Sequence, residues 1–543
     1  MLSCTTVAAL AKTGTQIDDF AERTVRGGVL TVLSATLRTT ASVPVQGATL
    51  EFQISDGSAW RSASVVSDVT TTNTVTDPAG HASAAFLPPD GVAPGRYRIR
   101  AFFGGNSNYA ASSTETVLNV EQAKCNDEGV VFDCAASWEV IRLATHRTDG
   151  PAVPLVLVHG SGADNEKNRE NDFTWATLKN SILQTSELAP FDVFIWKHDT
   201  ARAVGFNGAT GNAADLAEYI NKHLLPRYPA DTKVVFVAHS RGGLVVRSFM
   251  NYRDQGDRVL RLITLGTPHH GSPFALPDWA ALTWAANLGV YPSAFGTVYS
   301  FAFDATRLGH LSLAWDNMDG VLKESVVLNS TSGLAKDGRF ALTPADANAP
   351  ADTPDSTVFY SRSLKAAFGT LAELNQHERY REKIVRYGAF DDSLDDNDKL
   401  LKQSLTSLTV AFSLATDSHK ALQAATSFLA FFHTPLNTTA RYFANDGQVP
   451  LQSALFLDTS AGNAFSAIDR RKRVSLSGIS TNRNCGAQGP LPLNGNLYRV
   501  WWGSRDQIRD HRDLIETANR CYWQALALDI DSSVAPIGRS FKP

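Results

Sequence analysis

The chain lacks any apolar stretch as long as the roughly 18–20 residues that a membrane-spanning helix requires. It also lacks a basic run, apart from the isolated cluster at 470–473, and its formal net charge is −4. These absences argue against a transmembrane segment and against a nucleic-acid partner. Residues 1–12 lack the basic and apolar regions of a recognisable signal peptide.

Cysteine is scarce, with five in 543 residues. Cys125 and Cys134 bracket a short loop, and Cys485 and Cys521 flank a C-terminal segment. The simplest pairing is two disulfides with Cys4 as an odd thiol, and it predicts a secreted or cell-surface protein. Buried free thiols are the alternative interpretation.

Charged residues make up only 19% of the chain and hydrophobic residues 43%, which is typical of a globular protein. The length is too great for one hydrophobic core, so two or more domains are expected. Residues 1–26 form an N-terminal segment without a clear signal. From 27 to 123, short alternating segments separated by Gly, Pro and Asp predict a β-sandwich. The predicted strands are 29–39, 48–55, 82–89, 97–105 and 113–122.

Three motifs of this first domain resemble the bacterial immunoglobulin-like repeats of surface and secreted proteins. They are the strand Val43–Phe52, the turn Thr76–Ala82 and the strand pair Tyr97–Tyr109. The resemblance implies a spacer or adhesion module that contacts a surface or polymer. Residues 124–153 are expected to be a connector.

A different pattern begins at residue 154. A continuous apolar segment of strand length lies at 154–158, mainly apolar segments of strand length lie at 193–196, 259–265 and 384–390, and a helical pattern lies at 211–225. This alternation predicts a doubly wound, mainly parallel α/β sheet over 154–543. Ligands bind at the carboxyl ends of such strands. The aromatic-rich segment at about 272–350 interrupts the pattern, and it is either an inserted cap, or lid, or an ordinary helical subdomain.

The strongest local motif is VVFVAHSRGGLVV at 234–246. It reads as a buried strand, a sharp turn at Ser240 and the start of a helix, which is typical of the G-x-S-x-G nucleophile elbow, with Ala238 at the first small position. The alternative is an ordinary strand-to-helix turn whose serine caps the helix.

A nucleophilic serine needs a base, and the base needs an acid, in the chain order Ser, Asp or Glu, His. His511 is the one histidine after residue 433, so it is the expected base. Asp446, in an Asn-Asp-Gly turn, is the preferred acid, and Asp391 and Asp392 are its competitors. The backbone N–H groups of Ser161 and Arg241 are the expected oxyanion donors.

Five ordered motifs resemble the bacterial true lipases of the α/β-hydrolase superfamily: VLVHGSG, VAHSRGG, LGTPHHGS, NDGQVP and the late Asp510-His511-Arg512-Asp513. The resemblance covers about 154–515. It implies that Ser240 is the nucleophile, Asp446 the acid and His511 the base, with no cofactor for catalysis. It also implies a structural calcium ion at Asp513 and the run that contains Asp392, Asp395 and Asp396.

The expected function is therefore a serine carboxyl-ester hydrolase acting on an ester or lipid. A polyester depolymerase or an amidase with the same triad is one alternative. The other is a surface adhesion protein with a non-catalytic hydrolase-like domain. The spacing of about 65 residues between Asp446 and His511 departs from the compact lipases, and the role of the 455–500 insertion does not follow from the resemblance.

Overall fold

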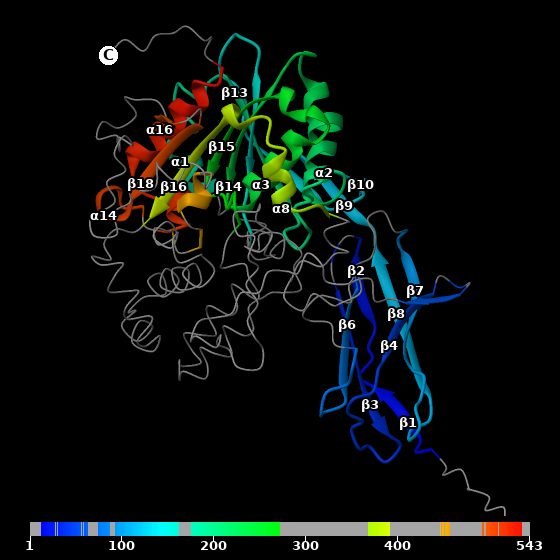
Figure 1. The fold of residues 1–543 in the computed structure, drawn as a ribbon. Coiled ribbons are helices and arrows are strands. Elements are labelled where there is room, and N and C mark those ends of the chain that lie inside the picture. Colours follow the sequence, from blue (N-terminus) through cyan, green and yellow to red (C-terminus); the bar gives the residue numbers. More distant parts are fainter. Residues whose placement is uncertain are drawn as a thin grey trace, which may run out of the picture. The chain divides into compact units, whose positions relative to one another are not determined.

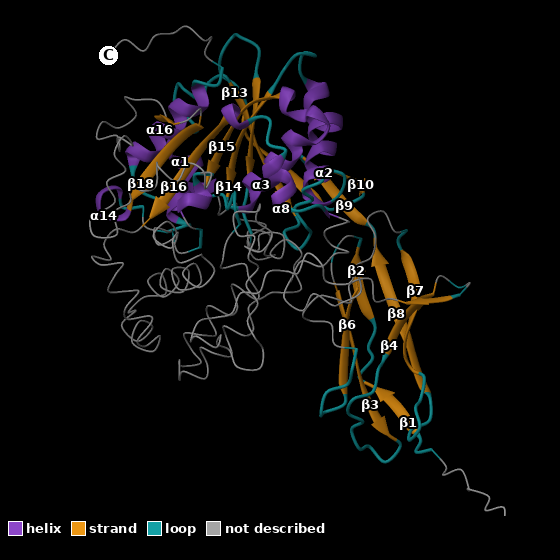
Figure 2. Cartoon of the chain, in the orientation of Figure 1, coloured by secondary structure: helices purple, strands orange, loops and turns teal. Residues whose placement is uncertain are grey.

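The computed structural model describes residues 12–161, 175–271, 368–390, 446–456 and 491–534, apart from short gaps at 28, 30, 56, 58, 63–73, 87–92, 447, 450, 494–495 and 509. The chain divides into two compact units, Met1–Ala123 and Lys124–Pro543 (Figure 1). Among the described residues, the first unit contains strands and loops, whereas the second combines strands with helices (Figure 2). No helix of the described part is long and apolar enough to cross a membrane.

The N-terminal unit contains two β-sheets, one of three strands in the order β1-β3-β6 and one of five strands in the order β2-β8-β7-β4-β5. Neighbouring strands are antiparallel, except for the parallel pair β2 and β8. The strands are β1 (Thr15–Asp18), β2 (Arg23–Arg26), β3 (Thr31–Thr39), β4 (Glu51–Ser55), β5 (Trp60–Ser62), β6 (His81–Phe86), β7 (Gly95–Phe103) and β8 (Ser112–Glu121).

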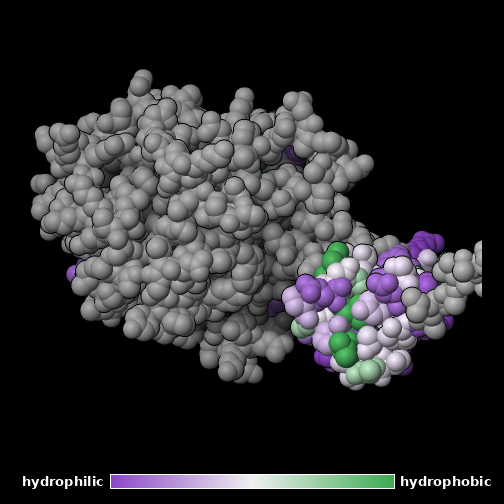
Figure 3. All heavy atoms as spheres, turned by 60° about the horizontal axis from the view of Figure 1, so that its bottom comes forward, coloured by the Kyte–Doolittle hydropathy of each residue, from purple (hydrophilic) through white to green (hydrophobic). Residues whose placement is uncertain are grey.

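The two sheets share one hydrophobic core, to which β3 contributes Leu37, β4 Phe52 and β7 Ile99. The five strands expected from the sequence are confirmed as β3, β4, β6, β7 and β8. The short strands β1, β2 and β5 were missed because three or four residues are too few to show alternation. Hydrophilic and hydrophobic residues are mixed on the face of this unit seen in Figure 3.

The second unit is built on a ten-stranded mixed sheet in the order β10-β9-β11-β13-β12-β14-β15-β16-β18-β17. Its six central strands, from β13 to β18 in this order, are parallel to one another. Its strands are β9 (Ala123–Asp127), β10 (Val130–Cys134), β11 (Trp138–Ala144), β12 (Val153–Val158), β13 (Phe191–His198), β14 (Val234–His239), β15 (Val259–Leu265), β16 (Ile384–Phe390), β17 (Leu491–Leu493) and β18 (Asn496–Trp502). The parallel strands expected at 154–158, 193–196, 259–265 and 384–390 are confirmed as β12, β13, β15 and β16.

Helices cover both faces of this sheet. Alternate residues of β12 show this, since Leu155 and Leu157 belong to one core with α1 and α16, whereas Val156 and Val158 belong to another with α2 and α3. The helical segments are α1 (Ala176–Ile182), α2 (Gly211–Glu218), the π-helical η3 (Tyr219–Leu224), η4 (Leu225–Arg227), α3 (Arg241–Asn251), η5 (Tyr252–Arg258), α8 (Leu371–Gln376), η8 (Arg381–Lys383), α12 (Leu451–Ala454), α14 (Gly503–Asp506), α15 (Asp513–Glu516) and α16 (Arg520–Asp531). Burial on both faces explains why the central strands are predominantly apolar.

The expectation that residues 124–153 form a connector is wrong. This segment supplies β10, β11 and most of β9, which extend the sheet on one side, and β11 is antiparallel to β13. The pattern concealed these strands because the edge strand β10 is largely exposed, as Val130 and Val131 are, and polar residues interrupt the apolar positions of the hairpin. The predicted cap at 272–350 lies outside the described residues.

Candidate active site

Ser240 occupies a sharp turn between β14 and α3. All six residues of β14 are buried, and α3 begins at the residue after the serine. Ser240 has φ 52° and ψ −129°, which is a strained backbone conformation for a residue with a side chain. Its N–H donates to Leu265 O at 2.9 Å, and its carbonyl accepts from Thr267 Oγ1 at 2.8 Å. The end of β15 and the residues after it therefore hold the strained turn.

The small residues of the motif are required by close approaches. A Cβ at Gly242 would lie 2.5 Å from the carbonyl oxygen of His159 and 2.7 Å from that of Val158. A Cβ at Gly243 would lie 2.0 Å from Thr267 Oγ1. These distances are too short for any side chain, so the helix can pack this closely against the ends of β12 and β15 only with glycine at these positions.

His511 and Asp446 form a buried hydrogen-bonded pair. His511 Nδ1 lies 2.7 Å from Asp446 Oδ2, and the backbone N–H of His511 donates to the carbonyl of Asp446 at 2.9 Å. Asp446 Oδ1 accepts the backbone N–H groups of Gln448 and Val449 at 3.0 and 2.7 Å. Because an ionised carboxylate only accepts, the proton of the imidazole is assigned to Nδ1.

The second nitrogen of His511 is then an acceptor, and it is buried without a hydrogen-bond partner among the described residues. Ser240 Oγ does not hydrogen-bond to it in this structure. Such bonds are often long before a substrate binds. The imidazole lies against the end of β15, since a Cβ at Gly266 would be 3.0 Å from both Nδ1 and Cε1 of His511. Leu265, the residue before Gly266, accepts the hydrogen bond from the Ser240 N–H.

The loop after β12 lies directly against the serine. A Cβ at Gly160 would be 2.6 Å from the Cβ of Ser240, and Ser161 follows with a buried hydroxyl that has no hydrogen-bond partner in the described part of the chain. Arg241 is the first residue of α3, where helix N–H groups have no intrahelical acceptor. The two expected oxyanion donors therefore flank Ser240 on the loop and on the helix.

His159 links this loop to the end of β13 through both of its ring nitrogens. Its Nδ1 donates to Gly160 O at 2.8 Å, and its Nε2 accepts the backbone N–H of His198 at 3.1 Å. The His159 and His198 rings are stacked with their centroids 4.2 Å apart. Burial, together with His159 and Arg241, holds the pKa of His198 well below its usual value.

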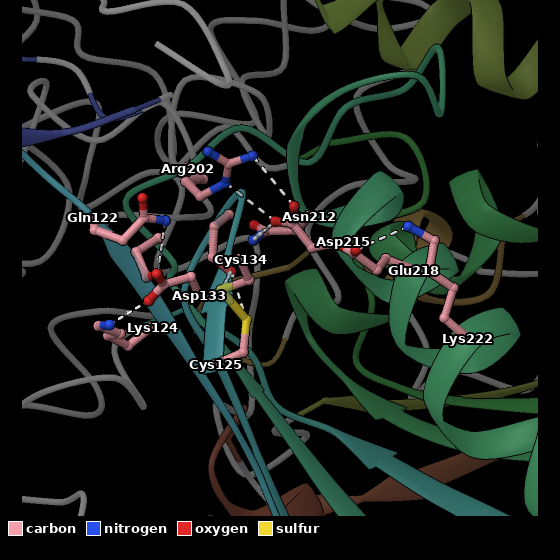
Figure 4. The surroundings of a disulfide bond; sticks show 12 residues. Gln122, Lys124, Cys125, Asp133, Cys134, Arg202, Asn212, Asp215, Glu218 and Lys222 are labelled. Carbon is pink, nitrogen blue, oxygen red and sulfur yellow. Dashed lines mark hydrogen bonds and ion pairs between the residues drawn. A yellow bond between two sulfur atoms is a disulfide. The ribbon is translucent and has the colours of Figure 1, made fainter. Parts of the chain in front are cut away.

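The sequence did not reveal the role of the Arg241 side chain, which is fully buried. Its guanidinium donates to His198 Nε2 at 2.9 Å and also to Arg202 O and Asn212 Oδ1. Arg202 in turn pairs with Asp215 of α2 at 3.1 Å (Figure 4). The available signal was a charged residue between the nucleophile candidate and the apolar start of the helix, because a buried arginine requires several acceptors.

Figure 4 also shows the disulfide between Cys125 and Cys134, whose Cα atoms are 5.8 Å apart. This predicted pairing is confirmed. Cys521 is also disulfide-bonded, whereas its expected partner Cys485 and the odd Cys4 lie outside the described residues.

The expected calcium ligand Asp513 begins α15 and accepts the backbone N–H of Asp510 at 3.2 Å. Asp392, Asp395 and Asp396 lie outside the described residues, as does the competing acid Asp391. Within the described part, no three His, Cys, Asp or Glu side chains are grouped as metal ligands. The calcium site therefore stays a prediction.

A family model described as a domain of unknown function (DUF7379) matches residues 131–301. Among solved structures, the propeptide form of Bacillus licheniformis lipase BlEst2 is 15% identical, with a TM-score of 0.27, and the match covers 58% of this chain and 46% of that one. The mature form is 16% identical, with coverage of 69% and 92% and a TM-score of 0.26. The Tle4–Tli4 complex is 15% identical, with coverage of 64% and 70% and a TM-score of 0.33. The structural neighbours thus include a lipase.

Proposed function

We propose that this chain is a lipase-like serine carboxyl-ester hydrolase with Ser240 as nucleophile, His511 as base and Asp446 as acid. One observation carries the proposal. The Asp446-bound imidazole of His511 keeps a buried nitrogen without a hydrogen-bond partner in the described part of the chain, in the same site as a serine held in a strained turn.

The chemistry follows from these positions. His511 Nε2 takes the proton of Ser240 Oγ while that oxygen forms a bond to the ester carbonyl carbon. The backbone N–H groups of Ser161 and Arg241 stabilise the negative charge that develops on the carbonyl oxygen. The bond to the leaving alkoxide breaks as His511 returns the proton to it. Water, activated by the same nitrogen, then releases the acid from the acyl-enzyme.

The proposal is tested by labelling with a fluorophosphonate probe and by turnover of p-nitrophenyl esters. Ser240→Ala should lose both while keeping the fold. Ser248→Ala is the matched control. Ser248 lies in helix α3, which follows Ser240, and its hydroxyl donates a hydrogen bond to Gly205 O at 2.6 Å. Its loss should cost only about 1 kcal/mol of stability and leave labelling intact. Ester turnover retained in Ser240→Ala would refute the proposal.

The substrate class is tested on the wild-type protein with emulsified triglyceride, polyester film and amide substrates. Preference for the film or the amide would favour the alternative hydrolases. Absence of labelling at Ser240 would favour a non-catalytic adhesion protein.

We further propose that the protein is secreted or attached to the cell surface, and that residues 27–123 form an immunoglobulin-like module that holds the enzyme at a surface or polymer. The Cys125–Cys134 disulfide supports an oxidising location. The two sheets with a shared core support the sandwich. Comparing binding to polyester film with and without residues 1–123 tests the role of the module.

A further inference from the structure

His239, the last residue of β14, contacts two other segments of the candidate site. Its Nε2 lies 3.0 Å from the carbonyl oxygen of His511, and the two rings have centroids 4.6 Å apart. A Cβ at Gly160 would lie 3.1 Å from His239 Nδ1. The side chain next to Ser240 in sequence therefore touches the loop that carries the base and the loop after β12.

The hydrogen bond defines the state of the His239 ring. A carbonyl oxygen only accepts, so Nε2 carries the proton and donates. Burial and the neighbouring His511 hold the pKa of His239 well below its usual value. The ring is therefore neutral at neutral pH, and it adds no positive charge beside an imidazole that becomes cationic during ester cleavage.

Both main-chain groups of His511 are hydrogen-bonded within the site. The N–H donates to Asp446 O at 2.9 Å, and the carbonyl accepts from His239. The bond from His239 spans 272 residues of sequence and joins the strand that ends at the nucleophile to the residue that acts as base. The loss of the bond from His239 would leave the His511 backbone restrained from the acid side alone.

We infer that His239 is a positioning residue that holds the backbone of His511, and so sets its imidazole relative to Ser240. This inference rests on the proposed function. It assigns to His239 no contact with substrate and no proton transfer. Its action is on the geometry of proton transfer, and displacement of a catalytic group by about 1 Å can lower the rate about 100-fold.

Two substitutions separate the hydrogen bond from the ring. His239→Phe keeps an aromatic ring but removes the donor, whereas His239→Gln places an amide N–H near the position of Nε2 and removes the ring. We expect His239→Phe to lower kcat for a p-nitrophenyl ester by about 10- to 100-fold, with KM within about twofold. His239→Gln should recover kcat to within about fivefold of wild type, because the bond to His511 is retained. The rate of fluorophosphonate labelling should follow kcat.

His223→Phe is the matched control, because His223 stacks on Phe132, with ring centroids 4.9 Å apart, in the packing of η3. It should leave kcat unchanged. All rates are divided by the folded fraction from circular dichroism, so a purely structural role of His239 would lower stability but not kcat per folded molecule. A kcat for His239→Phe within twofold of wild type, or equal losses in the Phe and Gln variants, would overturn the inference. A wild-type protein that fails to react with the probe would instead refute the proposed function and the inference together.

Discussion

Asp446 and His511 are joined by two hydrogen bonds, from Nδ1 to the carboxylate at 2.7 Å and from the backbone N–H to the carbonyl of Asp446 at 2.9 Å. The first bond selects the tautomer of His511 that leaves Nε2 as an acceptor. The second fixes the loop that carries the ring.

Replacement of Asp446 by Asn should lower kcat by about 1,000- to 10,000-fold, because an amide N–H next to His511 Nδ1 favours the opposite tautomer. The fold should be kept, since the amide oxygen can still accept the N–H groups of Gln448 and Val449. Steady-state kinetics on a p-nitrophenyl ester measure the effect. Asp391→Asn tests the competing acid, and a larger loss in that variant would show that Asp446 is not the acid.

Replacement of Gly160 by Ala should slow acylation by about tenfold or more, because the new Cβ would lie 2.6 Å from the Cβ of Ser240. The overpacking should also cost about 1–3 kcal/mol of stability. The rate of fluorophosphonate labelling measures acylation directly. Gly150→Ala is the matched control, since no atom lies within 4 Å of its Cβ position. Equal labelling rates in the two variants would argue against close packing at Gly160.

Removal of the Cys125–Cys134 disulfide should destabilise the C-terminal unit by about 2–3 kcal/mol, because the bond closes a short loop with a sequence separation of 9. The double variant Cys125→Ala and Cys134→Ala avoids placing a polar group at Cys125, which is fully buried. Urea unfolding without reductant measures the difference. An unchanged midpoint would mean that the packing of β9 and β10 holds the hairpin without the crosslink.

The stability of the C-terminal unit should fall as the pH drops below about 6.5, the usual histidine pKa in an unfolded chain. Burial, the largest cause in each case, holds the pKa values of His198, His239 and His269 well below that value. The unfolded chain therefore binds more protons than the folded chain, and each histidine costs up to about 1.4 kcal/mol per pH unit below 6.5. Above that pH, these histidines do not change the free energy of unfolding with pH.

Urea unfolding at pH 7.5, 6.5 and 5.5 measures this slope. His269→Gln should reduce it, whereas His377→Gln should not, because His377 is exposed. A stability that is constant between pH 7.5 and 5.5 would contradict the prediction.

Local sequence was sufficient for the elements with strong, regular patterns. The strands β15 and β16 occupy the residues expected for them, because strands buried on both faces are predominantly apolar. The turn at Ser240 could also be predicted from neighbouring residues, since it forms only with glycine on one side and a small residue on the other.

The edge of the sheet was not predictable in the same way. β9 is partly exposed, β10 is largely exposed, and each has five residues; their pairing depends on β11 and a disulfide rather than on their own pattern. A connector and a pair of edge strands have the same composition when only one face of the strands is apolar.

The sequence by itself determined the nucleophile candidate and the parallel sheet that carries it, because both depend on neighbouring residues. It also limited the base to His511, since no later histidine competes. Only the tertiary structure decided that Asp446 accepts the hydrogen bond of His511, that Arg241 extends its guanidinium to His198, and that His239 holds the His511 backbone. Those contacts join residues far apart in the chain, and their geometry exists only when the ends of the strands meet at one edge of the folded sheet.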